Sequence, residues 1–304
     1  MEEEVISMAA NYFYLGNPIK ALKEFQDLEG TELNNTCKER ISFYSTIIYL
    51  SLNDPSNTMK AVNSLSNQNA KIVLENLVKY FTETNLDPKL MGEVYSEMTD
   101  DDIKRKDPSN SLTILSCGYL LYCMKQYESL LKLIGDIDQI DINYLKFYTY
   151  YEYYRYDYME TTLISISKLF PDSTMHSLLA HFLEIAKGIS VDISNLNDIA
   201  QKFDTSLRLY NIIALGYLQL GERWLAQKII EKALNETDII KNPQKWIGNT
   251  EAESLVINIC LCIDDLSDKI KDYEEILKKI NPESEYFKTN ENISKLVDDA
   301  IKNV

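Results

Sequence analysis

Residues 215–234 read LGYLQLGERWLAQKIIEKAL, and this stretch predicts a helix, a glycine-marked turn and a second helix. Gly221 supplies the positive φ angle that a tight turn after a helix requires, at little steric cost. Ala226 and Ala233 are small enough for two helices to approach closely, whereas a bulky residue there would overpack by about 1–3 kcal/mol. Trp224 is predicted to fill part of the remaining space between the helices. The stretch therefore predicts a tightly packed helical hairpin.

A second copy of this pattern lies near the amino terminus, where residues 11–25 read NYFYLGNPIKALKEF. In both copies a glycine precedes an alanine by five residues and a large apolar residue follows four residues later; here they are Gly16, Ala21 and Phe25. Gly16 and Gly221 are 205 residues apart, which is about six periods of the roughly 34 residues that form a tetratricopeptide repeat. One hairpin cannot bury its apolar faces alone, so hairpins of this kind stack. The predicted fold is all-α: a tetratricopeptide-repeat-like α-solenoid, a right-handed superhelix of helical hairpins.

The composition of the chain also predicts its domain organisation. No linker rich in glycine, serine or proline interrupts residues 1–304, which are predicted to form a single α-solenoid domain. Residues of about 1–238 are predicted to form tetratricopeptide-like hairpins, and residues of about 239–304 a carboxy-terminal helical hairpin and cap. The clearest hairpins are expected near 3–33, 111–137, 141–172 and 207–238. The residues predicted to build the repeats are Gly16, Ala21, Phe25, Gly118, Gly221, Trp224, Ala226 and Ala233.

A solenoid of this kind presents a concave face, lined by the first helix of each hairpin, on which partners bind. Between residues 144 and 158 lie eight of the 21 tyrosines of the chain. On one helix they would point all round the axis, so some must meet solvent or a partner. Each is either a core or lightly exposed residue, or a partner contact of the kind enriched at interface hot spots. The residues predicted to bind a partner on the concave face are Phe13, Tyr14, Tyr119, Tyr122, Tyr148, Tyr151, Asn211, Leu218 and Gln219.

The net charge and the amino-terminal sequence of the chain indicate which classes of partner to expect. The formal net charge of −16 repels the phosphates of nucleic acid and of anionic lipid, so neither is expected as a partner. The amino terminus lacks the basic and apolar regions of a signal peptide, and no apolar run is long enough to span a membrane. The five cysteines are odd in number and form no CxxC pair, which indicates reduced thiols. We expect a soluble cytoplasmic chain whose partners are proteins.

No pattern in the sequence indicates catalysis. The only histidines, His176 and His181, are five residues apart and would diverge on a helix, so they are not expected to share a metal ion. No phosphate-binding loop, GxGxxG, GxSxG or HExxH motif occurs. We therefore predict no enzyme activity, no metal site and no cofactor.

Several stretches of the chain resemble one family more than the generic repeat. Residues 221–226, GERWLA, followed by EKAL at 231–234, are similar to the most recognisable part of the ε subunit of coatomer, the coat of COPI vesicles. Residues 11–16 and 20–24 resemble the amino terminus of that family. The remaining similar stretches are 196–203, 206–211, 254–258, 285–288 and 296–297.

The resemblance implies a scaffold role without active-site residues. Coatomer ε subunits bind and stabilise the carboxy-terminal region of the α subunit within their curved array. This implies a chain that is cytoplasmic and peripheral on Golgi and COPI-coated vesicle membranes, which acts in Golgi-to-ER and intra-Golgi transport and meets membrane only through the rest of the coat.

Three other roles fit the sequence less well. A tetratricopeptide-repeat co-chaperone or other peptide-binding adaptor would need basic residues on its first helices, where Ile6 and Ala10 stand instead. An enzyme carried on a helical solenoid lacks a catalytic constellation. A subunit of a proteasome-lid-type assembly would end in a winged-helix module with strands, and the region after Asn281 has no strand pattern.

Overall fold

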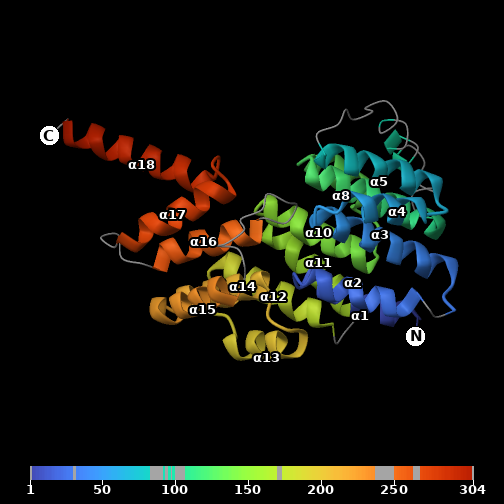
Figure 1. Ribbon diagram of the computed structural model, residues 1–304, viewed down its shortest axis with the longest axis horizontal. Coiled ribbons are helices and arrows are strands. Elements are labelled where there is room, and N and C mark those ends of the chain that lie inside the picture. The colour runs from blue at the N-terminus through green and yellow to red at the C-terminus, as the bar shows by residue number, and fades with distance from the viewer. Residues whose placement is uncertain are drawn as a thin grey trace. The chain divides into compact units, whose positions relative to one another are not determined.

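The computed structural model describes residues 2–29, 32–82, 92, 95–96, 98–99, 107–169, 173–236, 250–262 and 268–302 (Figure 1). Throughout these residues the regular secondary structure is helical. The chain divides into two compact units, Met1–Lys187 and Gly188–Val304. That residues 1–304 act as one domain stays a prediction.

In the first unit, successive helices pack on their neighbours along the chain. α1 contacts α2 and α3, α3 contacts α4, α5 contacts α8, and α8 contacts α9 and α10. This neighbour-to-neighbour packing is the arrangement of an α-solenoid, so the predicted fold class is confirmed. The helices are α1 (Glu2–Tyr14), α2 (Pro18–Glu29), α3 (Asn35–Ser51), α4 (Pro55–Asn63), α5 (Gln68–Phe81), the short 3₁₀ helix η1 (Pro108–Asn110), α8 (Ser111–Cys123), α9 (Tyr127–Ile134), α10 (Ile140–Glu152), α11 (Tyr156–Leu169) and α12 (Thr174–Lys187).

The second unit begins with α13 and contains the hairpin predicted from residues 215–234. α14 packs on both α15 and α16, and α16 packs on α17. The helices are α13 (Ile193–Phe203), α14 (Leu207–Gln219), α15 (Arg223–Glu236), α16 (Thr250–Cys262), α17 (Asp268–Ile280) and α18 (Glu285–Lys302). The predicted end of this hairpin, residues 237–238, lies outside the described residues.

Side-chain caps explain where several helices begin. The side chains of Asn34, Asp54 and Asn67 accept hydrogen bonds from the backbone N–H three residues later, at the starts of α3, α4 and α5. Ser206 does the same at the start of α14. Each cap satisfies a backbone donor that a helix start would otherwise leave open.

The same three-residue turn joins the two helices of five hairpins among the described residues. In each, the second turn residue has a positive φ angle, and the third donates its backbone N–H to a carbonyl in the last turn of the first helix. Examples are Asn17 N–H to Tyr12 O at 2.7 Å and Glu222 N–H to Tyr217 O at 2.9 Å. This is the Schellman arrangement that ends many helices. The positive-φ residues are Gly16, Asn53, Lys125, Tyr154 and Gly221.

The turn geometry predicts opposite effects on stability for substitutions at Gly221 and Lys125. A Cβ atom at Gly221 would meet nothing within 4 Å, so Gly221→Ala tests the φ angle of +78° alone and should cost about 1 kcal/mol. Lys125 has a φ angle of 57° and is exposed, so Lys125→Gly should raise the free energy of unfolding by about 0.5–1 kcal/mol. Urea unfolding followed by circular dichroism measures both. A loss of stability in Lys125→Gly comparable to that in Gly221→Ala would contradict this account.

Five of the predicted repeat residues lie in the interior: Ala21, Phe25, Gly118, Ala226 and Ala233. Ala21 and Phe25 of α2 are buried, and so are Ala226 and Ala233 of α15. At Gly118 a Cβ atom would lie 2.8 Å from Leu145 Cδ2 and 3.2 Å from Leu130 Cδ1, so glycine lets α8 approach α9 and α10 closely. Gly16 and Gly221 occupy the turns.

Trp224 differs from the expectation that it packs within the hairpin. Its side chain is 61% exposed, and Lys228 Nζ lies 3.7 Å from the ring centroid. Ala226, Ile230 and Ala233 follow at helical spacing on the buried face, and Trp224 stands two residues before Ala226. Two residues correspond to about 200° round a helix, which turns the indole away from the core.

Because of this exposure, Trp224→Ala should change the free energy of unfolding by less than about 0.5 kcal/mol. Thermal unfolding monitored by circular dichroism measures the effect. A destabilisation of several kcal/mol would show that the indole is a core residue after all.

Candidate interaction face

Half-buried aromatic side chains lie on neighbouring first helices of the hairpins in the first unit. α1 contacts α3 and α12, and α8 contacts α3 and α10, so these helices lie next to one another. Six residues predicted to bind a partner lie on them, and all six are half-buried. We call this set the first-helix face: Phe13, Tyr14, Tyr119, Tyr122, Tyr148 and Tyr151.

Ring contacts hold the first-helix face against neighbouring aromatic side chains, of which Phe43 and Tyr44 are buried. The ring centroid of Phe13 lies 6.0 Å from that of Tyr44, and that of Tyr119 lies 6.3 Å from that of Phe43. At the other end, the ring centroids of Tyr148 and Tyr151 lie 6.1 Å and 4.7 Å from that of Phe182 in α12. These contacts hold one side of each ring in place and leave the rest partly accessible. A partner would meet rings that are already ordered.

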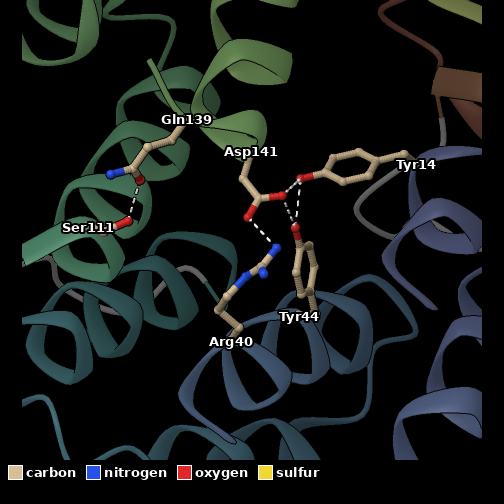
Figure 2. Close-up of polar contacts among 6 residues, drawn as sticks. All are labelled: Tyr14, Arg40, Tyr44, Ser111, Gln139 and Asp141. Carbon is tan, nitrogen blue, oxygen red and sulfur yellow. Dashed lines mark hydrogen bonds and ion pairs between the residues drawn. The ribbon is translucent and has the colours of Figure 1, made fainter. Parts of the chain in front are cut away.

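A polar cluster around Asp141 joins α1, α3 and α10 (Figure 2). Arg40 Nη2 donates to Asp141 Oδ2 at 2.8 Å, and the Tyr44 hydroxyl donates to Asp141 Oδ1 at 2.5 Å. The Tyr14 hydroxyl lies 3.0 Å from that of Tyr44 and 3.4 Å from Asp141 Oδ1. Because the single Tyr44 proton points to the carboxylate, Tyr14 is left to donate to the Tyr44 oxygen. The ring centroid of Tyr14 also lies 4.8 Å from the ring centroid of Tyr144.

Burial determines the ionisation of this cluster. Burial, reinforced by neighbouring negative charge, raises the pKa of Tyr14 and Tyr44 well above the ordinary tyrosine value. Both hydroxyls therefore stay neutral donors, while the Arg40 and Asp141 side chains are only 17% and 13% exposed and form a charge-assisted pair. The cluster fixes α1 and α3 against the start of α10. Tyr14, predicted only as a partner contact, also contributes to this internal network.

A second polar contact lies nearby in Figure 2, between the first residue of α8 and the residue before α10. The Ser111 hydroxyl donates to Gln139 Oε1 at 2.5 Å. No local sequence pattern indicates Arg40, Tyr44, Ser111, Gln139 or Asp141, since the contacts join residues as much as 127 positions apart.

The tyrosine-dense segment is split between two helices and a turn. Tyr144, Tyr148, Tyr150 and Tyr151 lie in α10, and Tyr153 and Tyr154 form the turn that leads to α11. The exposed fraction of these tyrosine side chains ranges from 5% for Tyr144 to 76% for Tyr154. Residues 144–158 therefore do not form one helix, because the chain reverses at the positive-φ Tyr154, inside the hairpin predicted near 141–172.

The three residues predicted on the concave face of the second unit occupy different environments. Asn211 is buried, and its Oδ1 accepts from Asn258 Nδ2 at 3.1 Å, which joins α14 to α16. Leu218 is half-buried against the hydrophobic core that includes Ile230. Gln219 is exposed at the end of α14. Of the three, Gln219 presents the most side-chain surface to a partner.

The reactive side chains elsewhere show environments typical of structural residues. His181 is buried with Nδ1 2.8 Å from Glu184 Oε2, and burial lowers the pKa of the half-buried His176. Burial raises the pKa of the Cys117 and Cys123 thiols to about 12, which keeps them protonated. Within the part of the chain that the structure describes, His, Cys, Asp and Glu form no group of three or more suited to a metal ion. Over the same residues, no helix is long and apolar enough to cross a membrane.

Stacked helical hairpins with a half-exposed aromatic face are typical of scaffold proteins, which act by binding other proteins. The chain belongs to the coatomer epsilon subunit family, since the family model described as "Coatomer epsilon subunit" matches residues 3–296. Membership makes it a subunit of the COPI coat that assembles with other coatomer subunits.

Comparisons with solved structures and with curated proteins give less information about the family. A solved tetratricopeptide repeat protein from Parabacteroides merdae ATCC 43184 is similar at 13% identity, covering 92% of this chain and 98% of that one with a TM-score of 0.39. No curated protein matches the chain.

Proposed function

We propose that the chain is a non-catalytic scaffold subunit that binds and stabilises the carboxy-terminal region of the coatomer α subunit. In this role it acts in Golgi-to-ER and intra-Golgi vesicle transport, in the cytoplasm and at the surface of Golgi and COPI-coated vesicle membranes. The observation that carries the proposal is the family match over residues 3–296, which spans both units. Membrane contact is indirect, through the rest of the coat, in keeping with a net charge of −16.

The first-helix face suits an extended partner segment. Its rings are held from one side, so a partner buries apolar area with little further loss of side-chain entropy. The Tyr148 and Tyr151 hydroxyls offer hydrogen bonds that fix the backbone of an extended segment. A permanent subunit contact requires an interface of roughly 2,000 Å² or more, so the face supplies the centre of a larger contact area.

Affinity purification of the tagged chain from cells, followed by mass spectrometry, tests the assignment. We expect the other coatomer subunits, with the α subunit retained most strongly at high salt. Recovery of chaperones in place of coat subunits would contradict the proposal and favour the co-chaperone alternative.

A further inference from the structure

The tyrosines of the first-helix face continue into the two hairpin turns that follow α8 and α10. The ring centroid of Tyr122 lies 5.7 Å from that of Tyr127, the first residue of α9. The ring centroid of Tyr127 in turn lies 5.7 Å from that of Tyr153, which directly follows α10. A segment that lies along the first-helix face therefore meets these turns at its end. We call this end of the face the tyrosine–Glu152 group: Tyr122, Tyr127, Tyr151, Glu152 and Tyr153.

The Glu152 carboxylate lies among the tyrosines of this group. Burial, and after it the negative charge of Glu152, raises the pKa of Tyr122, Tyr127 and Tyr151 above the ordinary tyrosine value. The three hydroxyls therefore stay neutral and cannot balance the charge of the carboxylate. The Glu152 side chain is exposed, and among the residues that the structure describes it forms no ion pair.

The position of Glu152 on its helix adds to this negative charge. Glu152 is the last residue of α10, and the last turn of α10 contains no basic residue. The carboxy-terminal end of a helix carries a partial negative charge, so a cation is favourable there and a carboxylate is unfavourable. Within the fold the Glu152 charge is therefore a cost. A cation supplied by a partner would offset both the carboxylate and the helix end.

The other charges of the two turns do not neutralise Glu152. Arg155 donates to both carboxylate oxygens of Asp157, at 2.9 Å and 2.7 Å, so its charge is already matched. Lys125 and Glu128, on and just after the α8–α9 turn, are both exposed and carry opposite charges. Within the described part of the chain, neither of them forms an ion pair. The two turns together keep an excess of negative charge.

Tyrosine rings beside an exposed carboxylate provide the surroundings that a guanidinium or ammonium group prefers. The face of an aromatic ring attracts a cation, and the carboxylate accepts charge-assisted hydrogen bonds from it. We propose that the tyrosine–Glu152 group binds a basic side chain, arginine or lysine, of the partner segment that lies on the first-helix face. This inference rests on the proposed function for the identity of the partner, but the site itself can be tested without the α subunit.

Fluorescence polarisation of the full chain, with a labelled peptide that alternates glycine and arginine, tests the site directly. We expect saturable binding at low salt. The same peptide with citrulline in place of arginine keeps the shape of the side chain but not its charge, and should not bind. Glu152→Gln should weaken binding of the arginine peptide about 3–5-fold, as for an exposed ion pair. Tyr153→Leu keeps an apolar side chain but removes the ring, and should weaken binding about 2–5-fold.

The matched control is Glu32→Gln, which removes the same charge from an exposed side chain in the connection before α3. Its affinity for the arginine peptide should equal that of the wild-type chain, and far-UV circular dichroism should show unchanged helical content in all three variants. Equal weakening by Glu32→Gln would reveal a general attraction to a chain of net charge −16 and overturn the proposal.

Wild-type affinity in either Glu152→Gln or Tyr153→Leu, or equal binding of the citrulline peptide, would also overturn the proposal. Failure of the wild-type chain to bind the α region would instead contradict the proposed function, and the peptide measurements would still decide whether the tyrosine–Glu152 group binds a basic side chain.

Discussion

Replacement of Asp141 by asparagine is expected to lower the free energy of unfolding of the first unit by about 2–4 kcal/mol. Asparagine keeps the volume of the side chain but removes the negative charge that faces Arg40 at 2.8 Å. It also turns one of two accepting oxygens into a donor, where Arg40 and Tyr44 both donate. Removing one partner of a fully buried ion pair costs about 3–5 kcal/mol, and the 13–17% exposure of these side chains reduces that range.

The chain offers a matched control for this substitution. Asp157 forms a similar pair with Arg155 at 2.7 Å, but both side chains are at least half exposed. Asp157→Asn should leave the unfolding midpoint unchanged, since solvent already screens such a pair. Urea denaturation of both variants provides the comparison. Equal unfolding midpoints for Asp141→Asn and the wild-type chain would show that the cluster in Figure 2 does not hold α1 and α3 against α10.

Replacement of both Tyr148 and Tyr151 by serine is expected to weaken binding of the α subunit's carboxy-terminal region by roughly 100-fold or more. A central tyrosine at an interface contributes about 2 kcal/mol, and each 1.4 kcal/mol corresponds to a factor of ten in affinity. Both rings pack on Phe182 and are half-buried, so enough surface remains for a partner to cover. Surface plasmon resonance with the immobilised α region measures the change.

The fold of this double variant has to be checked alongside binding. Far-UV circular dichroism should show the same helical content as the wild-type chain. Trp224→Ala, which removes an exposed aromatic ring from α15, should bind the α region with unchanged affinity. If the double variant is folded and also binds with wild-type affinity, the first-helix face is not the binding site.

The sequence predicted the helical hairpins where glycine marks the turn. Gly16 and Gly221 both lie in turns of the predicted kind, with φ angles of 85° and 78°. The equivalent turns at Asn53, Lys125 and Tyr154 carry side chains, so glycine could not reveal them. Helical periodicity continues through such a turn, and this is why residues 144–158 appeared to form one helix.

The burial of individual residues could be predicted only where their spacing along a helix places them on the buried face. Ala226 and Ala233 are seven residues apart and share the buried face of α15, as their size and spacing indicated. Trp224 was expected beside them because large apolar residues are usually buried, yet its position on the helix turns it outward.

The polar cluster could not have been found from the sequence. Asp141 looks like an acidic residue in the first turn of a helix, a common position that needs no partner. Its donors are Arg40, 101 residues away, and Tyr44, 97 residues away. Such pairs are set by the packing of one hairpin on another, and no local pattern in the sequence encodes them.

The central claim is that this coat subunit binds the carboxy-terminal region of the α subunit. Isothermal titration calorimetry with the two purified proteins tests it most directly. We predict a saturable heat of binding, a negative heat-capacity change from the buried aromatic surface, and an equimolar complex that survives gel filtration. Absence of any binding heat between the two folded proteins, with separate elution on gel filtration, would contradict the account.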